Sequence, residues 1–368
     1  MASVLLTAGC GGGSSDDAAA SGSGGAKVDV AAAQAAIKPL LSPPTEFTLT
    51  EPLKAMPKAG SVVVFLDNGT PTAASMFNSL NDAAKVLGVT LQRVQTGQSP
   101  QDVNAALNTV VESKPAAVVD LAIDPALFSS QLTALRKAGT AFVPMAIVDG
   151  EKFGLDDDQI QSGAHAAEEN GKTLASALVA ETNGKATNLV FYRVPELNFT
   201  PIEEKGVKER LAEQCPGCEL RVVDIPISQV GSTAARTIVS DLQAHPDTQG
   251  FVASIDDLQM GLPAAMDVAG LDIPGIGIAS NPVNLQQIAA GKQLAGMATD
   301  LHFVAFTLMD QVARDLAGQD SDYSHLAGAA GPETNQIITK ENAPSDPQVG
   351  YLSFPDYKER FTKLWTGQ

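Results

Sequence analysis

The sequence predicts an α/β protein made of two doubly wound parallel-sheet lobes. Short, almost continuously apolar segments alternate with longer segments of helical periodicity over residues 62–148, and the pattern starts again over residues 163–316. Continuous apolar runs are typical of strands that are buried on both faces, and strands that alternate with helices form parallel sheets through right-handed crossovers. The length of 368 residues also indicates more than one domain.

The first lobe follows a short N-terminal helix and an extended arm, which together occupy residues 27–60. Pro43 and Pro44 end the Ala-rich helix, and proline and lysine punctuate the arm. Helix starts in the lobe itself are marked by caps, as where Ser99 precedes Pro100 at the first helical position. We expect strands at 62–66, 89–94, 117–123 and 142–148, and helices at 72–87, 100–112 and 125–137.

The second series of units has the same character and ends in a crossing segment. Residues 318–331 are charged and rich in Gly and Ser, which is typical of a connection, and residues 351–365 predict an amphipathic C-terminal helix. We expect strands at 187–192, 220–225, 251–255, 275–278 and 294–299, and helices at 163–181, 201–214, 232–244, 258–269, 283–290 and 302–316.

The composition excludes several classes of function. There are 24 Lys and Arg residues against 42 Asp and Glu, so the formal net charge is −18. Such a chain repels phosphate backbones and anionic lipids, and we expect no nucleic-acid partner. Three cysteines and four histidines share no ligand spacing, so we expect no metal and no cofactor. The chain shows no Gly-x-Ser-x-Gly, His-Glu-x-x-His or phosphate-loop motif, so we expect that the protein is not an enzyme.

Residues 1–26 are expected to be a lipid attachment signal and a flexible tether. Residues 6–10 read Leu-Thr-Ala-Gly-Cys and resemble the bacterial lipobox, in which small residues precede a cysteine that receives a diacylglyceryl group. Residues 11–25 contain only Gly, Ser, Ala and Asp, which cannot bury enough surface to order themselves. We therefore expect lipidation at Cys10 and anchoring to the outer face of the cytoplasmic membrane, with no other membrane contact.

Cys215 and Cys218 enclose a Pro-Gly pair that favours a type II turn, which brings the first and fourth Cα atoms within about 7 Å. A redox-active pair usually lies between a strand and a helix start, whereas this pair follows a helical segment and precedes a strand. Zinc would need a second pair of ligands at suitable spacing. We therefore predict a structural disulfide, as an oxidising compartment allows.

From about residue 60 to residue 340 the chain resembles the type I periplasmic solute-binding proteins of ABC transporters, in the ribose-binding group. The order of units matches, and so do the short pieces at 143–149, 242–253 and 289–298. Repressors of the same fold carry a DNA-binding helix pair where this chain has a lipobox and an acidic tether. The resemblance implies a monomeric two-lobed clamp of the Venus-flytrap type that delivers a solute to an ABC permease.

The resemblance also implies domain boundaries and three crossovers between the lobes. We place the crossovers near 149–165, 278–283 and 325–336. The first lobe would contain residues 61–160 and 281–328, the second lobe 161–280 and 329–340, and a C-terminal extension 341–368.

The solute is expected at the carboxyl ends of the strands, where open α/β sheets bind ligands. Asp67 and Asn68 end the first strand, Asp149 and Asp256 match family carboxylates, and Arg193 is placed to pair a ligand carboxylate. The full set of expected ligand residues is Asp67, Asn68, Thr70, Asp149, Tyr192, Arg193, Phe199, Asp256, Ser280 and Asn281.

The expected cleft is less polar than that of the family's sugar binders, which use arginines and stacking aromatics. The matching positions here include Gly150, Ala166, Ala167, Ile255 and Ala279. Unmet hydrogen-bond demand is costly, so we expect an aromatic, alicyclic or short carboxylic solute. A sensor that presents its solute to a receptor kinase, or a sugar-binding protein with an atypical pocket, are the alternatives.

Overall fold

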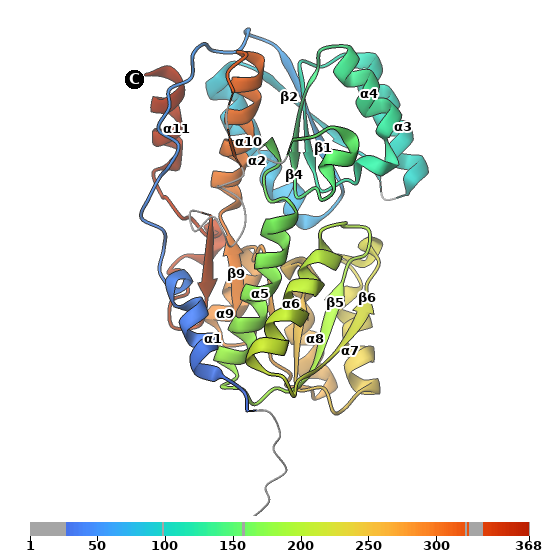
Figure 1. The fold of residues 1–368 in the computed structure, drawn as a ribbon, viewed down its shortest axis with the longest axis vertical. Helices are drawn as coiled ribbons and strands as arrows, with labels where there is room; N and C mark the ends of the chain where they lie inside the picture. Colours follow the sequence, from blue (N-terminus) through green and yellow to red (C-terminus); the bar gives the residue numbers. More distant parts are fainter. Residues whose placement is uncertain (1–26, 98, 157–158, 321, 324–333, 368) are drawn as a thin grey trace, which may run out of the picture.

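The computed structural model describes residues 27–367 apart from 98, 157–158, 321 and 324–333. Two α/β lobes lie one above the other along the longest axis of the molecule (Figure 1). Cys10 and the tether lie outside the described residues. Among the described helices, none is both long and apolar enough to cross a membrane.

The upper lobe contains a parallel four-stranded sheet in the order β2-β1-β3-β4. Alternate residues of β1 face opposite sides, so Val63 and Phe65 pack with α2 and α10, while Val64 and Leu66 pack with α3 and α4. This two-sided burial explains the continuous apolar run in the sequence. The elements are β1 (Val62–Asp67), β2 (Thr90–Gln95), β3 (Ala117–Leu121), β4 (Ala141–Met145), α2 (Pro71–Leu87), α3 (Pro100–Ser113), α4 (Ser129–Lys137) and α10 (Leu301–Leu316).

The lower lobe repeats this plan with a parallel sheet in the order β6-β5-β7-β8. Leu189 and Phe191 of β5 pack with α5 and α6, whereas Val190 and Tyr192 pack with α7 and α8. The predicted fold class, two doubly wound α/β lobes, is confirmed. The elements are β5 (Asn188–Arg193), β6 (Glu219–Asp224), β7 (Gly250–Ala253), β8 (Gly275–Gly277), α5 (Ala164–Glu181), α6 (Thr200–Gln214), α7 (Ala234–Ala244), α8 (Leu262–Ala269) and α9 (Pro282–Ala289).

A small antiparallel sheet extends the lower lobe. It pairs β9 (Gly296–Thr299) with β10 (Asn335–Ile338). A single bridge between Ile278 and Met297 attaches β9 beyond the end of β8, and Ile338 packs with the apolar side chains of α9. The elements α9, β9 and β10 therefore belong to the lower lobe.

This arrangement differs from the expected boundaries in one place. Residues 281–328 were expected to complete the first lobe, with a crossover near 278–283, but the chain stays in the lower lobe until Thr299 and only α10 joins the upper core. The reason is the pairing of β9 with β10, a strand that lies beyond α10 in the sequence and is not predicted by the local pattern. Most of the crossover expected near 325–336 falls outside the described residues.

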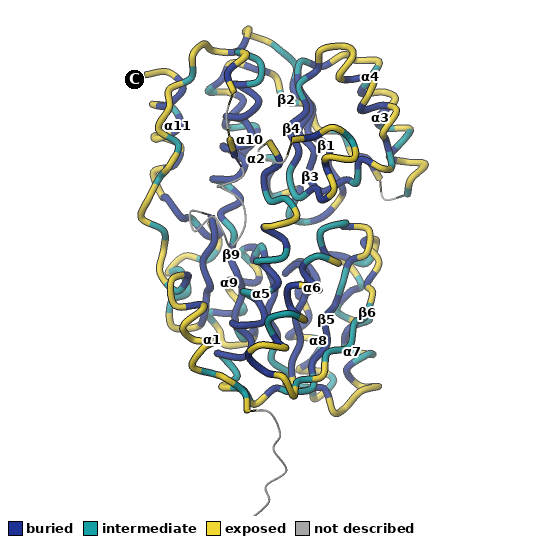
Figure 2. The backbone as a smooth tube through the Cα atoms, in the orientation of Figure 1, coloured by how far each residue is buried: buried dark blue, intermediate teal, exposed yellow. Residues whose placement is uncertain are grey.

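The N-terminal arm and the C-terminal segment also join the two lobes. Helix α1 (Val30–Ile37) packs on α5 of the lower lobe, and the arm then runs along the molecule to the upper lobe, where α11 (Tyr357–Thr366) also lies (Figure 1). The ring of Phe47 in the arm makes edge contacts with Phe303, Phe354 and Phe361, at centroid distances of 5.5–5.8 Å. Figure 2 shows that the most continuous burial lies in the inner strands, such as β1, β3 and β7, and in α5 and α10, whereas the edge strands β2 and β6 are largely exposed or half-buried.

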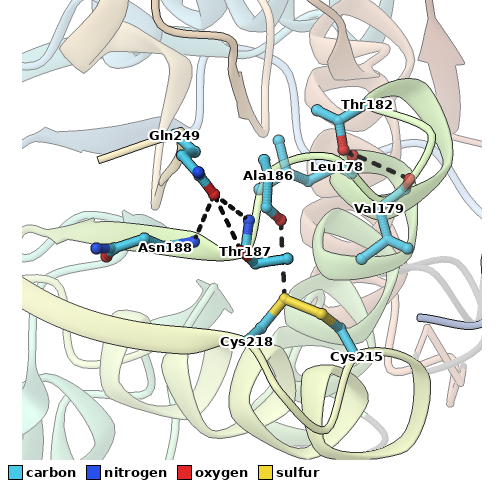
Figure 3. The surroundings of a disulfide bond; sticks show 9 residues. All are labelled: Leu178, Val179, Thr182, Ala186, Thr187, Asn188, Cys215, Cys218 and Gln249. Atoms are coloured by element: carbon cyan, nitrogen blue, oxygen red, sulfur yellow. Dashed lines mark hydrogen bonds between the residues drawn. A yellow bond between two sulfur atoms is a disulfide. The ribbon is translucent and has the colours of Figure 1, made fainter. Parts of the chain in front are cut away.

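A disulfide joins Cys215 and Cys218 where α6 ends and β6 begins, with the two Cα atoms 5.3 Å apart (Figure 3). Cys215 is buried in the core that contains α5 and α6. The carbonyl of Gln214, just before it, accepts a hydrogen bond from the N–H of Asp29, the residue that caps α1. The disulfide turn is thus beside the point where the N-terminal helix docks.

Helices α5 and α6 approach each other unusually closely because each has a glycine at the contact. A Cβ atom on Gly171 would lie 2.0 Å from the carbonyl oxygen of Glu203, and one on Gly206 would lie 2.1 Å from the carbonyl oxygen of Glu168. Neither backbone can shift without moving a helix. The crossing therefore fixes the first turn of α6, which faces the space between the lobes.

We expect Gly206→Ala to destabilise the protein by about 1–3 kcal/mol, because the added methyl group overpacks the helix crossing. Urea unfolding measures the change. Gly163→Ala is the matched control, since a Cβ there meets its nearest neighbour at an ordinary 3.6 Å, and its expected cost is below about 1 kcal/mol. Equal stability of the two variants would contradict the fixed crossing.

Candidate ligand-binding cavity between the lobes

A cavity of about 110 Å³ lies between the lobes at the carboxyl ends of the strands. The loops after β1, β3 and β4 line it from the upper lobe, and those after β5, β7 and β8 line it from the lower lobe. The lining residues are Asn68, Thr70, Thr72, Met76, Leu121, Ala122, Met145, Ala146, Gln161, Ser162, Ala167, Asn170, Leu197, Phe199, Glu203, Ile255, Asp257, Ile278, Ala279, Thr299, Leu301, Val304, Thr334 and Asn335.

Most of the cavity wall is apolar. Met76 and Leu121 face it from the upper lobe, and Leu197, Phe199 and Ile255 face it from the lower lobe. Among the described lining residues there is no Lys, Arg or His. The wall therefore offers hydrophobic contact and no positive charge.

Several polar lining groups are already engaged by the protein. The amide nitrogen of Asn68 donates to the carbonyl of Leu121, and its amide oxygen accepts hydrogen bonds from the N–H and the hydroxyl of Thr70. Gln161 donates to the side chain of Gln311 and accepts from the hydroxyl of Thr307 on α10. These hydrogen bonds hold in place the loop after β1 and the segment between β4 and α5. Little of the hydrogen-bonding capacity of these side chains remains for a solute.

Asp257 connects the lobes at the edge of the cavity. Its Oδ2 atom accepts hydrogen bonds from the N–H and the hydroxyl of Thr72, at 3.1 and 2.9 Å, in the first turn of α2. Its Oδ1 atom accepts from the amide of Asn281 at 3.0 Å. Burial raises the pKa of this carboxyl, while the helix N-terminus favours its negative charge. Gly231 of the lower lobe also lies against Pro71, so the lobes touch.

Glu203 is a buried residue of the cavity wall, and one of its two carboxyl oxygens has no hydrogen-bond partner. Only 1% of the residue is exposed, and its Oε2 atom has no partner. Burial raises its pKa well above the usual range. The apolar enclosure disfavours the charged form of this carboxyl, because no partner compensates for its lost hydration.

Asn68, Thr70 and Phe199 are the expected ligand residues that line the cavity. The other seven lie elsewhere. Asp67 is buried, pairs with Arg93 and accepts from the N–H of Gly69, while Asp149 is exposed and pairs with Lys152. The carboxylate of Asp67 holds the turn after β1 by its hydrogen bond from Gly69, and Asp149 begins a turn on the surface. Neither carboxylate lines the cavity.

Tyr192 and Arg193 lie at the end of β5 but point away from the cavity. The hydroxyl of Tyr192 donates to Asp241 of α7 at 2.8 Å, and Arg193 pairs with Asp224 and Glu204, both at 2.8 Å. The alternation of side chains along the strand sends one residue to each face of the sheet. Arg193 is therefore already neutralised by two carboxylates of the lower lobe.

Asp256, Ser280 and Asn281 form the framework behind the cavity. Asp256 is fully buried and accepts hydrogen bonds from Ser280, Gln259 and Gln293. Burial raises its pKa to about 7 against these donors. Asn281 caps α9 and holds Asp257. This network fixes the loop that carries Ile255 and Asp257 into the cavity.

The lining residues that the sequence analysis missed include Glu203, Asp257, Gln161 and Asn170. Asp257 directly follows a residue that was expected to bind, so a shift of one position would have found it. Glu203 lies in the first turn of α6, a charged helix in which one more carboxyl gave no signal. The sequence around Gln161 carries no local signal, because the position of this side chain depends on its hydrogen bonds to α10.

The periplasmic binding protein domain model matches residues 60–320 of the chain. The D-apiose import binding protein of Paraburkholderia graminis is 26% identical over 312 residues, which cover 77% of this chain and 94% of that protein. The 5-methylthioribose transporter solute-binding protein of Thermotoga lettingae, solved with 5-methylthioribose, has a TM-score of 0.69 at 15% identity and covers 85% of this chain and 99% of that one. A periplasmic solute-binding protein of Actinobacillus succinogenes, solved with D-allose, has a TM-score of 0.64 at 17% identity, with 77% and 99% covered.

We expect Thr72→Val to shift the ligand-free protein towards an open form. The substitution removes the hydroxyl that donates to Asp257, and a hydrogen bond to a charged group contributes about 1.5–3 kcal/mol. Small-angle X-ray scattering should show a larger radius of gyration. Thr109→Val is the control, since that hydroxyl bonds only within exposed α3. Identical scattering from both variants and the wild type would mean that this contact does not hold the lobes together.

Proposed function

The chain belongs to the periplasmic binding protein domain family, and from that premise we propose that it captures one small solute between its lobes and delivers it to an ABC permease. The observation that carries the proposal is the cavity at the strand ends of both lobes, bridged by Asp257 and Thr72. Its relatives are import binding proteins and not enzymes. A solute that touches both lobes binds the closed form more tightly, so its capture favours closure.

The size and polarity of the cavity favour a small uncharged solute. Its volume of about 110 Å³ is below the roughly 150 Å³ of an apolar cavity that binds benzene. A solute of one ring, or a short chain, is the size class that fits this arrangement of the lobes, and a larger solute such as an alkylthio sugar needs the lobes to lie further apart. We propose a compound less polar than an unmodified sugar, such as an alkylthio or deoxy sugar or an alicyclic alcohol.

The similar proteins support this class without fixing the compound. One is solved with 5-methylthioribose, a sugar whose methylthio group is apolar, and it supports the class directly. Others are named for D-apiose or ribose or are solved with D-allose, which are unmodified sugars, so they support a sugar-sized solute only. A carboxylic solute, which the sequence analysis allowed, is not favoured by the geometry. Arg193 is occupied by Asp224 and Glu204, and the described cavity wall holds no cation to replace it.

We expect 5-methylthioribose to raise the melting temperature of residues 26–368, and ribose, glucose, galactose, xylose and cyclohexanecarboxylate to leave it unchanged. A ligand at 100 times its Kd stabilises a protein by about 2.7 kcal/mol, which a thermal-shift assay detects. Ile255→Asn, which places an amide on the apolar wall, should weaken 5-methylthioribose about tenfold or more.

Asp272→Asn is the control for the wall substitution, because Asp272 is outside the cavity lining. Tight binding of an unmodified pentose or hexose would contradict the polarity argument and favour the alternative of a sugar-binding protein with an atypical pocket.

We further propose that the protein works outside the cytoplasm on a lipid anchor. The family is extracytoplasmic, the Cys215–Cys218 disulfide suits an oxidising compartment, and residues 6–10 resemble a lipobox. Helix α1 docks at the far end of the lower lobe, so a tether there leaves the cavity free (Figure 1).

We expect Cys10→Ser to release the protein into the medium, because the variant lacks the sulfur that receives the lipid. Cell fractionation and mass spectrometry of the amino-terminal peptide measure the change. The double variant Cys215→Ser, Cys218→Ser is the control and should remain with the membrane. An unmodified Cys10 in membrane-bound wild-type protein would contradict lipid anchoring at this residue.

A further inference from the structure

We propose that the Glu203 carboxyl determines specificity by forming hydrogen bonds with an uncharged solute, while Asp257 and the lack of a cation on the described wall disfavour anions. The inference rests on the proposed function, because it concerns the same cavity. It assigns a specificity-determining role to a residue that the family comparison does not point to.

The first argument is the position of the residue, which the helix crossing fixes. Its backbone carbonyl lies directly under Gly171, where even a Cβ atom would come within 2.0 Å. The preceding loop is held by the hydroxyl of Thr200, which donates to the carbonyls of Val194 and Leu197. The backbone of Glu203 is therefore fixed at the cavity wall, and only 1% of the residue is exposed.

The second argument is the charge around it. Burial alone accounts for the raised pKa of Glu203, because no charged neighbour contributes. Each nearby cation is matched by another carboxylate: Arg193 pairs with Glu204, and Lys172 and Lys205 both pair with Glu168. The charged and titratable groups on the surrounding elements are His165, Glu168, Glu169, Lys172 and Glu181 on α5, Glu204, Lys205, Lys208, Glu209, Arg210 and Glu213 on α6, Arg193 on β5 and Asp257 across the cavity.

The chemical consequence follows from these neighbours. A neutral carboxyl both donates and accepts a hydrogen bond, which suits a hydroxyl or ether oxygen of an uncharged solute. An anionic solute would meet the carboxylate of Asp257 and no compensating cation on the described wall. As pH rises through the pKa of Glu203, the donor is lost and a charge appears, so binding of an uncharged solute should weaken.

The test labels the intact protein with diisopropylcarbodiimide, an apolar reagent that reacts with protonated carboxyls. The Glu203 oxygen bonds to the carbodiimide carbon, the carboxyl proton moves to a carbodiimide nitrogen, and the adduct rearranges to a stable N-acylurea. We expect peptide mass spectrometry to find the label on Glu203 at neutral pH. The rate should fall about tenfold for each pH unit above the pKa, with the fraction of neutral acid.

Asp120 is the matched control within the same protein. It is fully buried, has an unpaired Oδ2 atom and a pKa raised well above the usual range, but it does not line the cavity. We expect it to stay unlabelled. Absence of label on Glu203, or equal labelling of Asp120, would overturn the proposal.

Charge selection itself is tested by protection from the label. We expect 5-methylthioribose to slow the labelling of Glu203 and cyclohexanecarboxylate at the same concentration to leave it unchanged. Protection by the carboxylate would overturn the proposal. If 5-methylthioribose fails to bind while Glu203 is labelled with the expected pH profile, the neutral acid is supported and only the solute class fails.

Glu203→Gln gives a second readout that needs no solute. Because the folded pKa of Glu203 is raised, the wild type has a stability contribution that is complete below the unfolded pKa of about 4.3 and is lost as pH rises through the folded pKa. Glutamine has no such proton. The unfolding free energy of the variant should therefore improve relative to the wild type as pH rises, and a constant difference would contradict a neutral acid.

Discussion

Gly171 and Gly206 bring α5 and α6 together until the backbone of one helix touches the backbone of the other. Much of the lower lobe depends on this contact. Helix α1 packs on the outside of α5, the disulfide closes the end of α6, and the first turn of α6 carries Glu203 to the cavity. Because two rigid backbones set the spacing, the position of the carboxyl is fixed by the scaffold and does not depend on the solute.

The contact between Asp257 and Thr72 joins the two lobes, and two opposing effects determine how strongly it does so. A buried carboxylate loses hydration when the lobes meet, and the raised pKa of Asp257 reflects that cost. The hydroxyl and N–H of Thr72 replace the lost water only in the closed form. The two effects oppose each other, so this contact alone contributes only modestly to holding the lobes together. Under the proposed function, apolar contacts of the solute with both lobes would add to it.

The periodicity of the sequence was enough to predict both lobes, because runs such as Val63–Leu66 in β1 record burial on two faces. It was not enough for β10, whose partner strand lies on the far side of α10. The candidate site shows the same limit. The end of a strand can be located from the sequence, but the partners of its last side chains cannot. Tyr192 binds the carboxylate of Asp241 on α7, and Arg193 binds the carboxylate of Glu204 on α6, so neither is available to a solute. Glu203 was missed because its neighbours Glu204 and Lys205 are also charged, and only the contact with α5 shows which of them lies on the cavity wall.

The buried carboxyls bear on the net charge of the folded protein. The formal charge of −18 counts every Asp and Glu as ionised, yet burial raises the pKa of Asp120, Glu203 and Asp256, the last to about 7. Asp256 therefore retains its proton up to about pH 7 in the folded chain, where the unfolded chain has released it. Because the folded pKa of all three groups is raised, they stabilise the fold less as pH rises. The described cavity wall lacks a basic residue that could compensate for a negative charge. The net negative charge and this wall act in the same direction, because both oppose an anionic solute under the proposed function, whereas neither opposes an uncharged one.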